Sequence, residues 1–220
     1  MAIGNAGGSN YLYAADNTGL VWVFDKNFKD VTFTTFAGKF VDPNSLPGFN
    51  PFNIQNINGN LYVTYAKVNS MGVGQPGGFV DEYDTGGNFI KRIATNGALS
   101  APWGITLAPG SFGQFSNDLL IGQFGDGQIL AYDPSTDSFL GILNGLNGMP
   151  IDNPFLWALN FRTGGPNTNT FSLYFTAGYN NQMDGLFGEI ATTPEPGTIT
   201  LLLAAAGSVG ARKLWHRMRA

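Results

Sequence analysis

Short apolar runs separated by turn-forming residues recur along most of the chain. Runs of this length that are rich in aromatic and β-branched residues predict strands rather than helices. Four of them have similar sequences: "YLYAAD" from residue 11, "LYVTYA" from 61, "LLIGQF" from 119 and "LYFTAG" from 173. Each is followed by a second run: "LVWVFD" to Asp25, "FVDEYD" to Asp84, "QILAYD" to Asp133 and "LFGEI" to Ile190. Asn, Asp and Gly between paired runs tolerate positive φ, so we expect antiparallel hairpins.

Prolines mark the start of a repeating unit. Pro51, Pro102 and Pro154 each precede an aromatic residue and an apolar run, at spacings of 51 and then 52 residues. A period near 50 is typical of propeller blades. Outer strands expected at "FIKRI" from 89 and "SFLGIL" from 138 complete four antiparallel strands per unit. The pattern predicts an all-β propeller, and the alternative is a β-sandwich with accidental spacing.

The expected units extend over residues 1–191 and supply about three and a half blades. The opening "MAIG" matches the end of an inner strand, so we interpret the chain as the C-terminal part of a longer propeller, truncated at its N-terminus. Propellers use four to eight blades, which leaves a compact four-blade ring as the alternative. The insertion 67–78 in the second unit is Gly-rich and is predicted to be a flexible surface loop.

Composition supports this fold class and excludes several kinds of chemistry. Glycine is abundant (31 residues), aromatic residues reach 14% and charged residues only 12%, as expected for short strands joined by tight turns. The absence of cysteine excludes disulfides and a cysteine nucleophile. The single histidine, His216, lies in the C-terminal tip, so the body has no histidine base and no Ser-His-acid triad.

Charge is segregated between the body and the end of the chain. Residues 1–193 carry 7 Lys and Arg against 14 Asp and Glu, which leaves no basic patch for nucleic acid. The last residues carry four cations and no acid: Arg212, Lys213, Arg217 and Arg219. Residues 198–211 are uncharged, and extension to residue 215 gives a marginal membrane span. Cations after such a span predict a cytoplasmic C-terminus.

Residues 192–220 resemble the PEP-CTERM sorting signal of diderm bacteria. The resemblance rests on Pro194-Glu195-Pro196, the apolar run and the terminal cations, in that order. It departs from the pattern in the threonine before Pro194 and in a tip that is less purely basic. The resemblance implies recognition by an exosortase, transient residence in the inner membrane through residues 198–215, and export to the cell surface or the extracellular space. The body also resembles an uncharacterised bacterial propeller family related to NHL-type repeats, which implies no known activity.

The sequence is compatible with two hypotheses of function and does not distinguish between them. The first is a non-catalytic module that binds an extracellular polysaccharide or a surface protein. The second is a gluconolactonase-like, metal-dependent hydrolase with its metal in the central channel. Candidate ligand-facing residues near the starts of inner strands are Asn53, Trp103, Asp152 and Asn153. Calcium needs six to eight oxygens, and only Asp152 among these is acidic, so we expect no catalytic residue, metal or cofactor.

Overall fold

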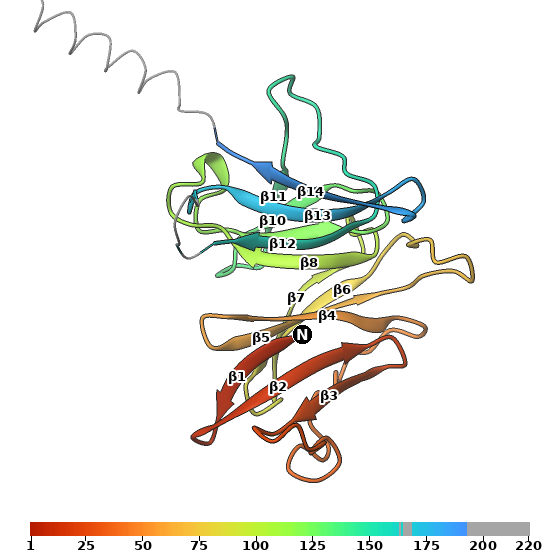
Figure 1. Cartoon of the computed structure of the whole chain (residues 1–220), viewed down its shortest axis with the longest axis vertical. Helices are drawn as coiled ribbons and strands as arrows, with labels where there is room; N and C mark the ends of the chain where they lie inside the picture. Colours follow the sequence, from red (N-terminus) through yellow and green to blue (C-terminus); the bar gives the residue numbers. More distant parts are fainter. Residues whose placement is uncertain (163, 165–168, 193–220) are drawn as a thin grey trace, which may run out of the picture.

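The computed structural model describes residues 1–162, 164 and 169–192, and these residues form four antiparallel β-sheets (Figure 1). Sheet 1 contains β1 (Ala2–Ala6), β2 (Ser9–Asp16) and β3 (Leu20–Phe24). Sheet 2 contains β4 (Asn50–Ile57), β5 (Asn60–Ala66), β6 (Phe79–Asp84) and β7 (Phe89–Thr95). Sheet 3 contains β8 (Pro102–Leu107), β9 (Leu119–Gln123), β10 (Ile129–Tyr132) and β11 (Phe139–Ile142). Sheet 4 contains β12 (Leu156–Phe161), β13 (Leu173–Tyr179) and β14 (Asp184–Ile190).

The strands follow the predicted pattern closely. In every sheet, strands adjacent in the sequence are also hydrogen-bonded neighbours, which is the antiparallel meander expected for a propeller blade. Pro51 and Pro102 lie in the first strands of sheets 2 and 3, and Pro154 lies just before β12. A single turn of 3₁₀ helix, Gly113–Phe115, is the one helical element in the part of the chain that the structure describes. The all-β prediction is therefore confirmed, and the architecture is consistent with a run of propeller blades.

The sheets pack face to face in the order of the sequence. Each junction has its own core, formed by alternate residues of the facing sheets. Sheets 1 and 2 meet through residues that include Tyr13, Val23, Leu61 and Val63. Sheets 2 and 3 meet through residues that include Tyr62, Val80, Ile121 and Leu130. Sheets 3 and 4 meet through residues that include Leu120, Ile129, Leu156 and Phe175.

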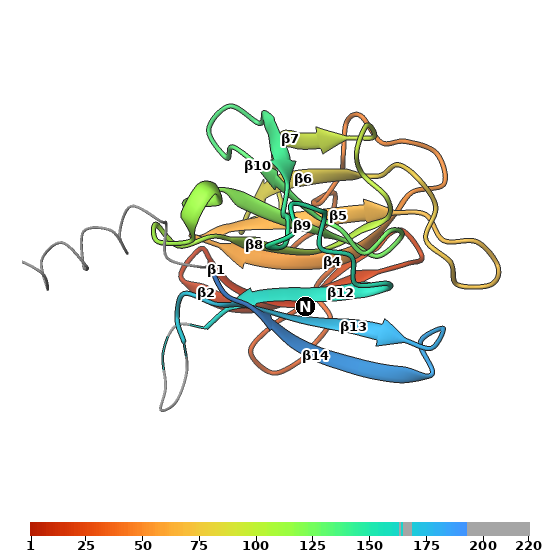
Figure 2. The same cartoon turned by 90° about the horizontal axis from the view of Figure 1, so that it is seen from above.

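The stack of sheets is open. Sheet 1 lies at one end of the long axis, and sheets 3 and 4 lie together at the other (Figure 1), so the described residues do not close a ring. Viewed from above, the first strands β4, β8 and β12 lie side by side, and the later strands of each sheet extend outward (Figure 2). The starts of these inner strands are therefore brought close together.

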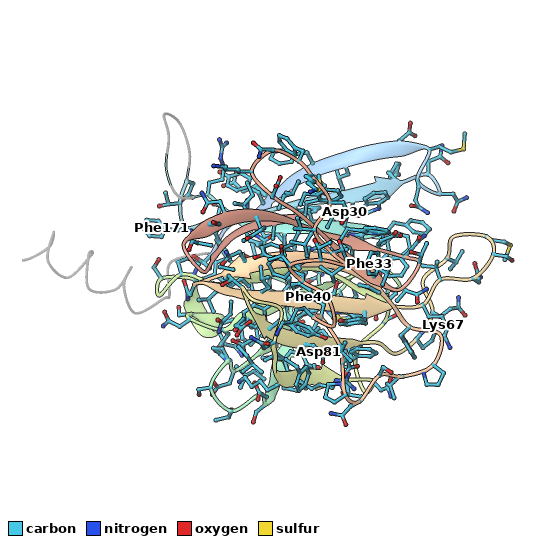
Figure 3. The ribbon with its side chains drawn as sticks, turned by 90° about the horizontal axis from the view of Figure 1, so that it is seen from below. Asp30, Phe33, Phe40, Lys67, Asp81 and Phe171 are labelled. Atoms are coloured by element: carbon cyan, nitrogen blue, oxygen red, sulfur yellow. The ribbon has the colours of Figure 1, made fainter. Side chains whose placement is uncertain are left out.

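A buried ion cluster holds the long segment between sheets 1 and 2. Arg92 on β7 donates to Asp81 on β6, with Nε 2.7 Å from Oδ1, and to Asp42 in the long segment, with Nη2 2.5 Å from Oδ2. The guanidinium also lies 4.0 Å above the Phe79 ring. Figure 3 shows Asp81 and Phe40 within the packed body, whereas Lys67 and Phe171 lie at its edges. Arg92 thus joins sheet 2 to a chain segment about 50 residues earlier.

The insertion 67–78 makes more contacts with the neighbouring sheet than expected for a flexible surface loop. Met71 at its tip is exposed, but the following residues form bridges from Pro76 and Gly77 to Ser100. A Cβ on Gly74 would lie 2.8 Å from Ala101 Cβ, because the loop packs directly on sheet 3. The insertion is therefore a loop at the surface whose second half packs against sheet 3.

The membrane prediction falls outside the described residues. Within residues 1–162, 164 and 169–192, no helix is long and apolar enough to cross a membrane. The predicted span 198–215 and the Pro194-Glu195-Pro196 motif both lie beyond residue 192, so the predictions made on them remain predictions.

The ion cluster predicts that substitutions at two neighbouring positions reduce the free energy of unfolding by very different amounts. Arg92→Met leaves the carboxylates of Asp81 and Asp42 buried without their cation, and we expect a loss of about 3–5 kcal/mol in the free energy of unfolding. Lys91→Met removes the more exposed pair with Asp137 and should cost less than about 1 kcal/mol. Urea unfolding at pH 7 measures both values, and equal losses would contradict a structural role for the Arg92 cluster.

The same cluster predicts a pH dependence of stability. Burial raises the pKa of the Asp81 carboxyl to about 6, although Arg92 acts in the opposite direction. Because an unfolded Asp titrates near 3.9, the folded state binds more protons between about pH 4 and 6. The contribution of this group to stability is therefore present below about pH 4 and is lost as the pH rises through 6. We expect the unfolding free energy of the wild type, measured against Asp81→Asn, to fall by on the order of 2 kcal/mol across this interval.

Candidate functional site

Three aromatic side chains form a row across the starts of the inner strands. Phe52 lies on β4, Trp103 on β8 and Trp157 on β12. The Phe52 and Trp103 rings meet edge to face with centroids 4.8 Å apart, and the Trp103 and Trp157 rings stack with centroids 5.2 Å apart. We call Phe52, Trp103 and Trp157 the aromatic row. Each of its members comes from a different sheet, so the row depends on the packing of sheets 2, 3 and 4.

Two further aromatic rings pack beside the row. Phe124, directly after β9, is buried, and its ring centroid lies 5.2 Å from that of Trp103. Phe155, just before β12, lies 5.3 Å from Phe124, measured between ring centroids. Both distances are within the range of favourable aromatic pairs. The indole of Trp103 is therefore held between other rings and has a defined orientation.

The backbone of Trp103 is tied to sheet 2. The side-chain amide of Asn53 donates to the carbonyl oxygen of Trp103 at 3.0 Å, and the Thr64 hydroxyl donates to the same oxygen at 3.2 Å. On the other side, a Cβ on Gly104 would lie 3.0 Å from the backbone nitrogen of Leu159 and from the carbonyl oxygen of Trp157. Glycine at position 104 thus permits β8 and β12 to approach closely, which brings the two tryptophans into stacking distance.

The row is open to solvent at its sheet 4 end. Trp157 is 41% exposed, and Phe52 and Trp103 are half-buried. Trp157 also borders a pocket of about 490 Å³ whose wall includes Thr176, Gln182, Met183 and Phe187. An exposed indole beside a pocket with an amide in its wall offers both a flat apolar surface and a hydrogen-bonding group.

A pair of carboxylates lies near the turn between β9 and β10. Burial raises the pKa of Asp126, and the negative charge of Asp152 raises it further. The Asn153 backbone N–H donates to the carbonyl of Gly127 at 2.9 Å, which joins this turn to the chain entering β12. The side-chain nitrogen of Asn153 is buried and has no hydrogen-bond partner among the described residues. Asp126 is two residues after Phe124, and Asp152 is three residues before Phe155. The carboxylate pair is therefore close to these two rings along the chain.

Acidic and other metal-binding side chains are not clustered in the described part of the chain. This part contains no group of three or more His, Cys, Asp or Glu side chains that could hold an ion. Asp126 and Asp152 therefore stand as a pair, and the hydrolase hypothesis receives no coordinating cluster from these residues.

The four predicted ligand-facing residues occupy two neighbouring places. Asn53 and Trp103 meet through the hydrogen bond described above, so the Asn53 side-chain nitrogen joins two sheets. Asp152 and Asn153 lie beside Gly127, where a Cβ would be 2.5 Å from Asp152 Oδ1. None of these contacts tests ligand binding, so the site remains a prediction.

Sequence reasoning missed Phe52, Phe124 and Trp157. Phe52 directly follows the repeat proline, as Trp103 does, and this shared position was an available signal. Trp157 is two residues further from its proline than Trp103 is, and a register shift between Leu156 and Ala158 lets it reach the row. A bulge of this kind changes side-chain direction without a clear sequence signature.

Two curated proteins of Acanthamoeba polyphaga mimivirus are similar to this chain in sequence. "Uncharacterized protein L690" is 31% identical over 190 residues, which cover 83% of this chain and 49% of that protein. "Uncharacterized protein R648" is 31% identical over 195 residues, which cover 85% of this chain and 47% of that protein. The chain thus spans about half the length of the curated relatives it matches. No protein-family model matches the chain.

Solved structures give weaker similarities. A chain in the crystal structure of a nidogen/laminin complex aligns with a TM-score of 0.48 and 17% identity, over 80% of this chain and 54% of that chain. The luciferin-regenerating enzyme aligns with a TM-score of 0.38 and 11% identity, over 86% of this chain and 76% of that one. Myxococcus xanthus glutaminyl cyclase gives 0.38 and 12%, over 80% of this chain and 60% of that one. At TM-scores below 0.5, these similarities assign neither a fold nor a function to this chain.

Proposed function

We propose that this chain is a non-catalytic binding module of propeller type that takes its ligand on the aromatic row. The observation that carries the proposal is the stacked pair of Trp103 and Trp157, which continues edge to face into Phe52. Three rings from three successive sheets form one surface, and Trp157 is 41% exposed. Such a surface suits recognition, because stiff aromatic side chains lose little entropy on binding.

The chemistry of the row favours an extracellular polysaccharide as the ligand. A sugar ring has an apolar C–H face that can lie on an indole and a rim of hydroxyl groups that need hydrogen-bond partners. Gln182 and Asp184 border the same pocket as Trp157 and offer amide and carboxylate groups for this purpose. Stacking and hydrogen bonding together fix the orientation of a ligand, as is usual in sites of mixed polarity.

The proposed destination agrees with this ligand class. We propose that the chain is exported from a diderm bacterium and is processed by an exosortase at Pro194-Glu195-Pro196, after transient anchoring in the inner membrane. The support for this step is the sequence of residues 192–220, in which the motif, the apolar run and the cations follow one another in that order. Release at the cell surface would expose the aromatic row to extracellular polymers.

Binding should depend on the row and not on exposed aromatic residues in general. Affinity electrophoresis through gels containing single soluble polysaccharides, both neutral and acidic, measures this directly. We expect at least one polymer to retard the protein. Trp157→Ala should weaken that binding by about ten- to thirtyfold, because it removes the most exposed stacking surface of the row.

The matched control is Phe33→Ala, which removes an aromatic side chain that is 64% exposed on the segment after sheet 1. It should leave retardation unchanged. A protein that no polysaccharide retards contradicts the proposed ligand class. Capture of a purified surface protein that is lost in Trp157→Ala would keep the row as the binding site and assign it a protein ligand.

Processing should depend on the charge between the two prolines. Glu195→Ala leaves the sheets folded, because it lies after the last described strand, and should block maturation in a host with an exosortase. The precursor should stay in the inner membrane fraction. Glu189→Ala, the same substitution on β14, should be processed normally. Intact mass measurement of the exported wild type decides the point, because a mature C-terminus that still contains Arg219 contradicts sorting.

A further inference from the structure

The strand registers allow equivalent positions to be identified in all four sheets. In each sheet, one residue of the second strand pairs with one residue of the third at the same point in the repeat. These pairs are Ala15 with Val21, Thr64 with Val80, Gly122 with Ile129 and Thr176 with Phe187. Val21, Val80 and Ile129 are at most 5% exposed, whereas Phe187 is 68% exposed. The fourth sheet therefore presents to solvent a position that is buried in the other three.

The buried members show what this position contacts. Val21 packs in the core shared with sheet 2, Val80 in the core shared with sheet 3, and Ile129 in the core shared with sheet 4. Each contacts the sheet that follows it in the sequence. Phe187 occupies the corresponding position in sheet 4, and no further sheet follows within the described residues.

Sheet 1 shows the opposite situation. A second set of equivalent pairs consists of Leu12 with Phe24, Leu61 with Tyr83, Leu119 with Tyr132 and Leu173 with Ile190. The leucines of sheets 2, 3 and 4 are fully buried and contact the preceding sheet. Leu12 and Phe24 are only half-buried, and Ile3, which pairs with Leu12, is 67% exposed.

The two ends thus carry different and complementary surfaces. The leading face consists of Ile3, Leu12, Trp22 and Phe24 on sheet 1, and the trailing face consists of Ala158, Tyr174, Thr176 and Phe187 on sheet 4. Phe187 on the trailing face borders a pocket of about 210 Å³ and also the outer edge of the 490 Å³ pocket beside Trp157, so association and ligand binding would compete for that edge. In each of the three junctions inside the molecule, the face of one sheet that is equivalent to the trailing face packs against the face of the next sheet that is equivalent to the leading face. Exposed apolar sheet faces of this sort mark interaction surfaces.

We propose that the trailing face of one copy of this chain binds the leading face of a second copy. The contact would repeat the packing that already joins sheets 1 to 2, 2 to 3 and 3 to 4, so no new kind of interface is needed. The described residues of two copies contain eight sheets, which is within the range of four to eight blades in a closed propeller. A head-to-tail interface closes into a ring when its rotation permits, and two copies would then share two identical contacts.

Polar residues on the trailing face are compatible with this packing. Glu189 pairs with Tyr174, as Glu82 pairs with Tyr62 in sheet 2. Glu82 is buried in the junction with sheet 3 and accepts a hydrogen bond from Asn60. An acid at this position is therefore tolerated inside a sheet junction when it finds a donor.

Sedimentation equilibrium of the full 220-residue chain in mild detergent tests the proposal. We expect the wild type to be a dimer. Phe187→Glu alters only the trailing face and Ile3→Glu only the leading face. Each should weaken association by at least about thirtyfold, because a central apolar contact is replaced by a buried charge. Leu146→Glu changes an equally apolar side chain that is 91% exposed on the loop after β11 and belongs to neither face, and it should leave the dimer intact.

Mixing the two variants gives the decisive result. Phe187→Glu keeps an intact leading face and Ile3→Glu an intact trailing face, so the mixture should form heterodimers through one native contact. Recovery of association also shows that both variants are folded. A wild type that remains monomeric overturns the proposal and indicates that these faces bind further sheets of a longer polypeptide. Open polymers would overturn ring closure, and a dimer that Ile3→Glu does not weaken would overturn the head-to-tail arrangement.

Discussion

The structure depends on the burial of both faces of each sheet. Alternate residues of a strand point to opposite faces, so one apolar run supplies a contact to the preceding sheet and a contact to the following one. Leu61 and Tyr62 illustrate this division, because they are neighbours in the sequence but belong to the cores of different junctions. A sheet built in this way buries both of its faces only between two others, and the aromatic row exists because three successive sheets hold their inner strands side by side.

Much of the fold could be predicted from the sequence, because the relevant signals are local. Apolar runs and hairpin turns predicted the strands, and the repeat prolines predicted their grouping into sheets. The Arg92 cluster could not be predicted, since Asp42 is 50 residues away in the chain and only tertiary packing makes them neighbours. The contact between the second half of the insertion and sheet 3 could not be predicted for the same reason. The glycines of the insertion suggested flexibility, but Gly74 serves close packing against Ala101.

The candidate site was predictable in part. The Pro-aromatic pattern pointed to Trp103, and the structure ties that residue to Asn53 by a hydrogen bond. Trp157 joins the row through an irregular register in β12, which has no sequence signature. The exposure of Phe187 was equally hidden, because its apolar character resembles that of the buried residues at equivalent positions. Whether such a position is covered depends on which sheet comes next, and this is a property of the assembled stack.

The packing of each sheet on its sequence neighbours also bears on how the chain folds and opens. Contacts between adjacent repeats are short-range in the sequence, so the stack behaves approximately as a one-dimensional array of units and junctions. Within the described residues of one chain, sheets 2 and 3 are each stabilised by two junctions, whereas sheets 1 and 4 have only one. Local opening should therefore cost least free energy at the two ends and most in the middle. Folding would accordingly start around β5 to β9 and proceed toward both ends, and the slowest amide exchange would be found in those central strands.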